Sequence, residues 1–494
     1  MPILGAVFSN GGIWSGTPNV AYSSAVWAVN QVNTTGTDPF LTSKTDSGTP
    51  AVNFTEAGQP VSGVASVSVG VFNLLGTNNL EAILDLPPSE VSAPQPIAYY
   101  ISNGVYAFNR ASLIVSNWIS GTNKSNPTGN NFQVYLQDVN PAGAVWFPPI
   151  TGHWNQLTND FYIVTNSSSS STTIVTSNLF SLPGFTSSDL TNSWGPSAKF
   201  LTWKVGTTNW GVKYAGWSFL TNVSFYDYRE SKTVQAVEIV VSNLDTWITN
   251  NGVNGGSNWN YALTADNGRG IDSVYVYNSV PMTSSHLPAV RVIGGAQLPY
   301  NLVVISGTTY TNDGLTVATP QPAYIGGDYN VRLATDAASS QPGTNNLAHT
   351  YPAAILADAI TVLSDSWKDS YNVNTNLSSR VPTATCFNAA CLEGIVQSST
   401  SYPTSGGATG YSGGVENFLR LLEDWSGSIP LTYNGSIIVM FPSQYATNFW
   451  QATGNYYNAP ERNWSFDTNF ENAAGLPPLT PTFSTALRQT WTGN

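Results

Sequence analysis

Hydrophobic and polar residues alternate in short stretches through the first 345 residues of the chain. The clearest stretch is residues 64–72, Val-Ala-Ser-Val-Ser-Val-Gly-Val-Phe, and such a period of two is typical of a half-buried strand. We expect further strands at residues 97–108, 132–139, 233–241, 272–277, 302–305 and 315–318. Gly, Pro and Asn interrupt the pattern at intervals of roughly 8–15 residues, as in sandwiches and barrels. The pattern therefore predicts a mainly β protein with a multi-domain β-sandwich or barrel-like architecture.

The pattern changes after residue 345. Residues 352–367 place apolar side chains three and four positions apart, which predicts an amphipathic helix with Pro352 in its first turn. Residues 414–425 show the same spacing and predict a second helix. Strands are expected beside them at residues 392–396 and 436–441. This part of the chain is therefore predicted to be an α+β region with two short amphipathic helices.

Three domains are predicted from these changes of pattern. An N-terminal β domain covers residues 1–165, a central β domain covers 175–345, and the α+β domain covers 346–494 and ends in an extended Pro-rich tail. A polar run at residues 166–173 is expected to be the loop between the first two. No convincing internal repeat is visible.

Charged residues are unusually few. Asp, Glu, Lys and Arg make up 9% of the chain, against about 25% in ordinary soluble proteins. Aromatic residues make up 12%, which is too many for a disordered chain. No apolar run approaches the roughly 20 residues of a membrane helix. The net charge of −12 and the lack of basic runs argue against nucleic acid as a partner.

A surface rich in Asn, Ser, Thr and Gly suits an extracellular or cell-surface protein. The first eight residues lack the pattern of a secretory signal. A removed signal, a start inside a longer precursor and another export route all remain open.

One motif and several carboxylate pairs are candidate catalytic groups. Residues 410–414 match the G-x-S-x-G pattern around Ser412, but all three histidines come earlier in the chain than the hydrolase order requires. A loop in which Ser412 caps a helix is favoured. Asp227 and Glu230 flank Arg229, which favours an ion-pair cluster. The pairs Glu423 with Asp424 and Asp365 with Asp369 are expected on solvated helix faces. We therefore predict no enzyme and no required cofactor.

Oxygen-rich loops leave calcium open as a bound cation. Asp266, Asn267 and Asp272 lie in one Gly-rich segment, and a hard cation takes carboxylate and amide oxygens. A turn between two strands is the favoured alternative. Cys386 and Cys391 either form a short disulfide or remain two buried thiols.

Surface chemistry gives two more sets of candidates. Eight Asn-x-Ser/Thr sequences occur, of which Asn463, Asn434 and Asn222 are the glycosylation candidates. The uncharged residues 1–37 are a candidate assembly arm that docks on a neighbouring subunit. Within them, Trp14, Tyr22 and Trp27 are candidates for an interface or for stacking on sugar rings.

Several long blocks resemble a known group of proteins. Three of the blocks are residues 225–239, 313–330 and 352–364. The last starts at residues 413–418 and continues to residues 462–467. Together, over about residues 220–485, they resemble uncharacterised bacterial envelope proteins found with PilX-like pilus-assembly components. The resemblance implies an exported, pilus-associated or filament-associated product. It implies no active site, and this sequence lacks the hydrophobic N-terminal helix of PilX-like proteins.

The sequence thus favours a non-catalytic structural subunit of an extracellular assembly, such as a pilus-like filament, a fibre or a surface layer. Its main partner would be further copies of itself, with surface glycans as a possible ligand class. The alternatives are a carbohydrate-binding adhesin or sugar-active enzyme, and a viral capsid or fibre protein.

Overall fold

The computed structural model describes about half of the chain, and every structural statement below refers to these residues. They are residues 2–3, 6–9, 13–14, 21–29, 32–33, 53–54, 60–64, 80–86, 106–117, 132–137, 154–157, 161–168, 171–176, 201–205, 208–216, 219–245, 271–293, 302–305, 308–311, 314–331, 351–396, 417–450, 456–472 and 475–480.

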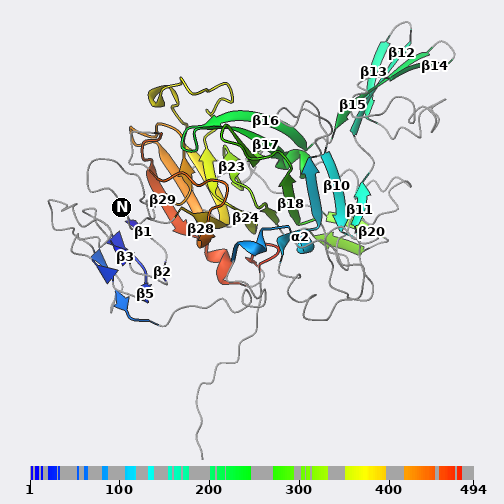
Figure 1. Ribbon diagram of the computed structural model, residues 1–494. Coiled ribbons are helices and arrows are strands. Elements are labelled where there is room, and N and C mark those ends of the chain that lie inside the picture. Colours follow the sequence, from blue (N-terminus) through cyan, green and yellow to red (C-terminus); the bar gives the residue numbers. More distant parts are fainter. Residues whose placement is uncertain are drawn as a thin grey trace, which may run out of the picture.

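Two large sheets form the main body (Figure 1). The nine-stranded sheet has the order β11 (Trp154–Leu157), β10 (Phe132–Gln137), β9 (Leu113–Asn117), β18 (Ser273–Asn278), β22 (Leu315–Ala318), β24 (Ala353–Ala357), β26 (Thr385–Ile395), β28 (Pro430–Pro442), β29 (Glu461–Phe466). The six-stranded sheet has the order β16 (Leu220–Asp227), β17 (Lys232–Val240), β19 (His286–Ile293), β23 (Ala323–Gly326), β25 (Ile360–Leu363), β27 (Arg420–Leu421).

The chain alternates between these two sheets, and this makes the main body a parallel β-solenoid. From β17 to β28 successive strands of each of the two sheets pair in parallel, one full turn apart, as β22 does with β24 and β23 does with β25. The coils differ in length, because Ala323 pairs with Ile360 whereas Thr361 pairs with Arg420. The β20 (Leu302–Ile305) and β21 (Thr308–Thr311) hairpin is one insertion between coils. At the start of the body β9, β10 and β11 pair antiparallel, as do β16 and β17.

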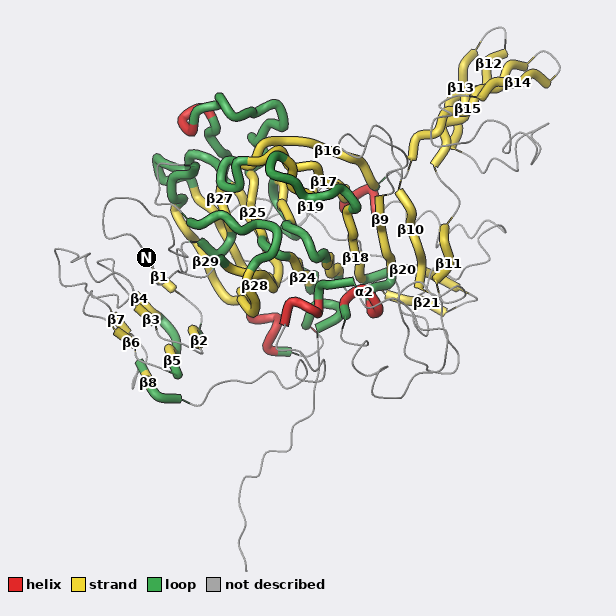
Figure 2. Tube along the Cα trace, viewed as in Figure 1, coloured by secondary structure: helices red, strands yellow, loops and turns green. Residues whose placement is uncertain are grey.

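The hydrophobic core lies between the two sheets. Inward side chains of both sheets, such as Val274 and Ile355 from one and Val292 and Val362 from the other, belong to one cluster. The outer faces are also covered. A short 3-10 helix, η2 (Leu80–Ile83), and a one-turn helix, α2 (Ala107–Arg110), pack on the nine-stranded sheet. Figure 2 shows these short helices, in red, at the margin of the strands.

The N-terminal residues form a smaller solenoid with three sides. Its sheets have the orders β1 (Pro2–Ile3), β4 (Ala21–Tyr22), β7 (Asn53–Phe54), then β2 (Val7–Ser9), β5 (Val26–Ala28), β8 (Val61–Ser62), then β3 (Ile13–Trp14), β6 (Val32–Asn33). Pro2 pairs with Ala21, Val7 with Val26 and Ile13 with Val32, so the first coil takes 19 positions on each side. The next coil is longer, because Ala21 pairs with Asn53 and Trp27 with Val61. This structural repeat was missed in the sequence.

A separate four-stranded antiparallel sheet completes the list of strands. Its order is β13 (Ser171–Thr176), β12 (Phe161–Ser168), β15 (Thr208–Gly216), β14 (Leu201–Val205). The polar loop expected at residues 166–173 is wrong, because Asn166 pairs with Thr173 and Ser168 with Ser171 in a hairpin. Two further 3-10 helices, η5 (Leu377–Ser379) and η7 (Thr468–Glu471), lie in connections.

Both predicted helices are wrong. Residues 352–367 contain β24 and β25 joined at Asp358 and Ala359, and the described part of 414–425 contains β27. Nearly all residues of β24 and β25 are buried. A strand buried on both faces loses the alternation of apolar and polar residues and reads as a continuous apolar run. In this chain such runs imitated the spacing of an amphipathic helix.

The mainly β prediction is confirmed, and so are most of the expected strands. Residues 132–139, 233–241, 272–277, 302–305, 315–318, 392–396 and 436–441 fall largely within β10, β17, β18, β20, β22, β26 and β28. Of residues 97–108, the described end is helical rather than extended. Residues 65–72 lie outside the described part. The described sheets form no closed barrel. The boundary expected at residue 345 falls between β22 and β24, which are neighbours in one sheet.

No helix among the described residues is long and apolar enough to cross a membrane.

Candidate functional site

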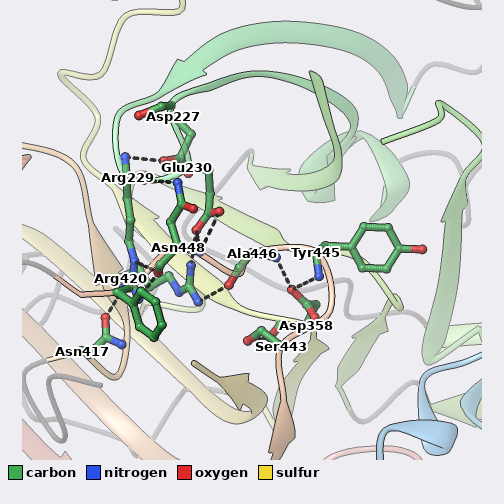
Figure 3. Close-up of polar contacts among 12 residues, drawn as sticks. Asp227, Arg229, Glu230, Asp358, Asn417, Arg420, Ser443, Tyr445, Ala446 and Asn448 are labelled. Carbon is green, nitrogen blue, oxygen red and sulfur yellow. Dashed lines mark hydrogen bonds and ion pairs between the residues drawn. The ribbon is translucent and has the colours of Figure 1, made fainter. Parts of the chain in front are cut away.

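A dense group of polar side chains lies where the β16–β17 turn folds over the six-stranded sheet (Figure 3). Asp227 shapes this turn, because its Oδ1 accepts the backbone N–H groups of Arg229 at 2.7 Å and Glu230 at 2.8 Å. Its Oδ2 accepts the hydroxyl of Tyr324, on β23, at 2.5 Å. The turn is therefore tied to β23, in the middle of the sheet, although it follows the edge strand β16.

Glu230, in this turn, forms a buried ion pair with a residue at the far edge of the sheet. Glu230 Oε1 lies 2.9 Å from Nη1 of Arg420, on β27, and both side chains are almost fully buried. Arg420 also donates to the carbonyl of Ala446 at 2.7 Å. The backbone N–H of Asn448 donates to the Glu230 carboxylate at 3.1 Å and 3.3 Å. Burial raises the pKa of Glu230, and the two neighbouring guanidinium groups oppose this.

Arg229 completes this group from the other side of the turn. Its Nε and Nη2 donate to the carbonyl of Asn448 at 3.1 Å and 3.0 Å, and its Nη1 donates to Oδ1 of Asn417. Asn448 returns a hydrogen bond from Nδ2 to the Arg229 carbonyl at 2.9 Å. Burial lowers the pKa of Arg229 to about 10, so it stays charged near neutral pH.

A second carboxylate holds the neighbouring corner between the two sheets. Asp358 connects β24 with β25 and is fully buried. Its carboxylate accepts backbone N–H groups from Gln444, from Tyr445 at 3.2 Å and from Ala446 at 2.8 Å, and its carbonyl accepts the Ser443 hydroxyl at 2.9 Å. The segment after β28 is therefore held by Asp358 and by the Glu230–Arg420 pair together.

Aromatic side chains stack along one line of the solenoid. Tyr329, Phe387, Tyr433 and Trp464 occupy matching positions on successive coils. Their ring centroids are separated by 5.8 Å, 5.5 Å and 5.8 Å in turn. Contacts at this spacing stabilise a sheet beyond the area that they bury.

The next position on each coil carries a second line, of polar side chains. Asn330 and Asn388 exchange hydrogen bonds between side-chain amides and backbone carbonyls at 2.8 Å and 3.1 Å. Asn434 donates from Nδ2 to Oδ1 of Asn388 at 2.7 Å, and Ser465 donates to Oδ1 of Asn434. The three asparagines are buried, so the stack satisfies their amides inside the protein. We call Asn330, Asn388, Asn434 and Ser465 the asparagine ladder.

A similar stack begins at the other end of the main body. Asn117 on β9 donates to Oδ1 of Asn278 on β18 at 2.7 Å. Gln321 then exchanges two hydrogen bonds with the backbone of Asn278, at 2.6 Å and 2.9 Å. Buried amides therefore link neighbouring coils at two positions around the solenoid.

Three glutamates have carboxyl groups with strongly raised pKa values. Burial raises the pKa of Glu81, Glu393 and Glu423 to about 7 in each case. Asp358 adds to the effect at Glu81 through like-charge repulsion. Glu423 accepts two hydrogen bonds from Ser364 at 2.7 Å. The solvated helix face expected for Glu423 is therefore wrong.

The ion-pair cluster expected around Asp227, Arg229 and Glu230 is found only in part. The salt bridge of Glu230 is made with Arg420, whereas Arg229 points to neutral oxygens of Asn417 and Asn448. Asp369, which was paired with Asp365 in the sequence, instead binds Arg291 at 2.5 Å and 2.8 Å.

The disulfide between Cys386 and Cys391 is wrong. Both are free and buried thiols on the single strand β26. Five positions along an extended strand span about 16 Å, and a disulfide needs Cα atoms less than about 7 Å apart. Burial raises the pKa of the Cys391 thiol, which keeps it protonated.

The calcium candidates are only partly described. Asp266 and Asn267 lie outside the described residues. Asp272 is buried and accepts the hydroxyl of Ser273 at 2.7 Å, and its backbone N–H donates to Ser112 at 3.1 Å. The described residues contain no group of three or more His, Cys, Asp or Glu side chains that could hold a metal ion. Calcium binding stays a prediction.

The three glycosylation candidates lie in different surroundings. Asn434 is fully buried in the asparagine ladder, which leaves no room for a glycan, so this candidate is wrong. Asn222 is half-buried on β16, and Asn463 is exposed on β29. Use of these two sites stays a prediction.

The aromatic residues proposed for an interface lie in the N-terminal solenoid. Tyr22 is buried with Val26 in a small core, and Trp27 is half-buried. Trp14 lies on β3, and its side chain is outside the described part. Ser412 also lies outside the described residues.

The sequence analysis missed both ladders. Their signal is an aromatic residue followed by Asn, at Tyr329-Asn330, Phe387-Asn388 and Tyr433-Asn434. The spacings between the ladder residues are 58, 46 and 31 positions. Because these spacings are unequal, the repeat becomes visible only when the strands are placed in register.

No family model, curated protein or solved structure matches this chain.

Proposed function

We propose that this chain is a non-catalytic structural subunit of an extracellular or cell-surface assembly. The observation that carries the proposal is the distribution of its charges. Only 44 of the 494 residues are Asp, Glu, Lys or Arg, and in the described part of the chain 13 of them are buried. A soluble monomer usually keeps about 25–35% of its surface residues charged. The share of charged residues on this surface falls far below that range. The buried centres of protein–protein interfaces are depleted of charged residues in the same way.

The solenoid supports the same proposal. Stacked coils make a rigid, elongated scaffold whose insertions present surface without disturbing the core. The buried charges described above bind backbone groups and one another, and this role is to hold segments of the scaffold together. The resemblance over residues 220–485 to envelope proteins associated with pilus assembly points to the same class of product.

Electron microscopy of material from the natural source tests this proposal. We expect ordered assemblies in which the particle repeats at a fixed spacing, on the outside of the producing cell or particle. Dispersed single molecules inside cells would contradict both the assembly and its location.

A glycan-binding adhesin is the second candidate, and one group of rings favours it. Tyr226, Trp367 and Tyr371 are half-buried near the β16–β17 turn. The rings of Trp367 and Tyr371 are 5.3 Å apart, and the exposed residues Asn372 and Asn374 follow in the same loop. Aromatic faces and amides are typical groups for holding neutral sugars. Calorimetric titration with neutral oligosaccharides tests this, with Tyr371→Ala expected to weaken binding and Val373→Ala expected to leave it unchanged.

A further inference from the structure

The last coil of the main body ends in an unusual edge. β28 runs from Pro430 to Pro442, but β29 pairs only with its first half, from Pro430 to Gly435. Among the described residues no strand pairs with the outer edge of residues 436–442. Their sequence is Ser-Ile-Ile-Val-Met-Phe-Pro, with no charge. Such an edge presents unpaired backbone groups that bind another strand readily.

The usual protection of such an edge is present only at its end, where a β-bulge near Met440 and Pro442 lie. Natural edge strands carry Lys, Pro or inward-pointing charges, or are covered. The edge residue Ile438 keeps 47% of its surface exposed. A β-bulge interrupts the register with β26 near Met440, so the regular stretch is residues 436–439. We call this stretch the β28 edge.

The sequence on both sides of the β28 edge is also uncharged. No Asp, Glu, Lys or Arg occurs between Asp424 and Glu461. Two of the eight large hydrophobic residues that are most exposed in the described part, Phe449 and Phe466, belong to the same last coil. Terminal coils of soluble solenoids normally have a polar outer face. This one instead has the composition of a contact surface.

The opposite end of the main body is different. There the sheets end in antiparallel strands, β9 with β10 and β11 in one sheet and β16 in the other. The β28 edge therefore has no matching parallel edge at the other end of the main body, which disfavours head-to-tail stacking. In a chain with a net charge of −12, two copies also meet with least repulsion where both surfaces are neutral.

We propose that two copies of this chain pair through the β28 edge, antiparallel and around a two-fold axis near Ile438. The contact is an added strand, so backbone hydrogen bonds join the two nine-stranded sheets into one. Because both copies use the same surface around the two-fold axis, this contact joins two copies and no more. This dimer rests on the proposed function, because it would be the building unit of the assembly, and larger growth uses another surface.

Charge introduced at the β28 edge tests the proposal. Ile438→Lys places two like charges opposite each other across the axis, which is destabilising. We expect it to raise the dimer dissociation constant at least tenfold in sedimentation velocity. The unfolding temperature at concentrations where the chain is monomeric should be nearly unchanged, because Ile438 is exposed. The matched control is Met282→Lys, at 46% exposure between β18 and β19, which should change the constant less than twofold.

A disulfide provides the second measurement and does not depend on the stability of a charged variant. In Ile438→Cys, two thiols face each other across the axis, at a separation that suits a disulfide. The native cysteines are buried and do not compete. We expect a covalent dimer after mild oxidation, and none with Met282→Cys.

The outcomes separate this surface from the proposed function. An intact chain that is monomeric at every concentration overturns both. An intact chain that associates, together with Ile438→Lys that associates equally well and Ile438→Cys that does not cross-link, overturns the β28 edge alone.

Discussion

Glu230 Oε1 lies 2.9 Å from Nη1 of Arg420, although the two residues are 190 positions apart in the sequence. The pair joins the first hairpin of the six-stranded sheet to its last strand, β27. It is one of the longest-range contacts that define the solenoid, and both side chains are buried.

Breaking this pair should destabilise the fold strongly. Glu230→Gln leaves the Arg420 charge buried without its counter-charge, and such a change costs about 3–5 kcal/mol. Chemical denaturation measures it, with the exposed Glu471→Gln as control. In a double-mutant cycle, Glu230→Gln with Arg420→Met should lose clearly less than the sum of the single changes. Additive losses would mean that the two groups are not coupled.

The asparagine ladder gives a second prediction, with a control of the same residue type. Asn434→Ala removes the donor to Asn388 and the acceptor of Ser465, and an unsatisfied buried partner costs about 1–3 kcal/mol. Asn463→Ala, exposed on the neighbouring strand, should change the free energy of unfolding by less than about 0.5 kcal/mol. Equal losses from the two variants would show that the ladder does not stabilise the solenoid.

Stability should fall as pH rises from about 4.5 to 7. In this range the folded protein keeps a proton on Glu81, Glu393 and Glu423, whose pKa values are about 7, whereas the unfolded chain has released it. The native state then binds more protons, so the stabilisation is complete below about pH 4.5 and is lost as pH rises through 7. For the fully buried Glu393, the change corresponds to roughly 3 kcal/mol.

Urea denaturation at several pH values measures this dependence. Glu393→Gln should flatten it, because an amide does not titrate, and Glu471→Gln should leave it unchanged. A stability that increases between pH 5 and 7 is incompatible with protonated glutamates in the core.

The two thiols should behave as buried, unlinked groups. We expect native protein to react slowly with a thiol reagent and the unfolded protein to show two free thiols. A reducing agent should leave the unfolding temperature unchanged. A reductant-sensitive unfolding temperature would indicate a disulfide and would conflict with the placement of Cys386 and Cys391 on one strand.

The sequence predicted the strands better than their arrangement. Residues 233–241 and 315–318 were recognised from alternation or from short β-branched runs. The helix expected at 352–367 failed because β24 and β25 are covered on both faces. Leu356 of β24 packs against residues 80–86 and 106–111, and Leu363 of β25 packs with Phe225, all far away in the sequence. Local periodicity carries no information about such distant covers.

The candidate site was predictable only in part. The cluster at Asp227, Arg229 and Glu230 is local, so its charges were visible in the sequence. Its main partner, Arg420, could not be predicted from the sequence. The coils differ in length, so the sequence does not show which residues of successive coils lie side by side. The coils of the N-terminal solenoid were hidden for the same reason, because the first takes 19 positions and the next 32 to 34, and also because their strands are only two or three residues long.

The central claim is that this charge-poor solenoid works as a subunit of an assembly. Light scattering of the intact chain over a wide range of concentrations measures this most directly. The account predicts a mass that rises from that of one 52.7 kDa chain to at least twice that value, with little dependence on salt because the contact is neutral. A mass that stays at one chain throughout the range would contradict it.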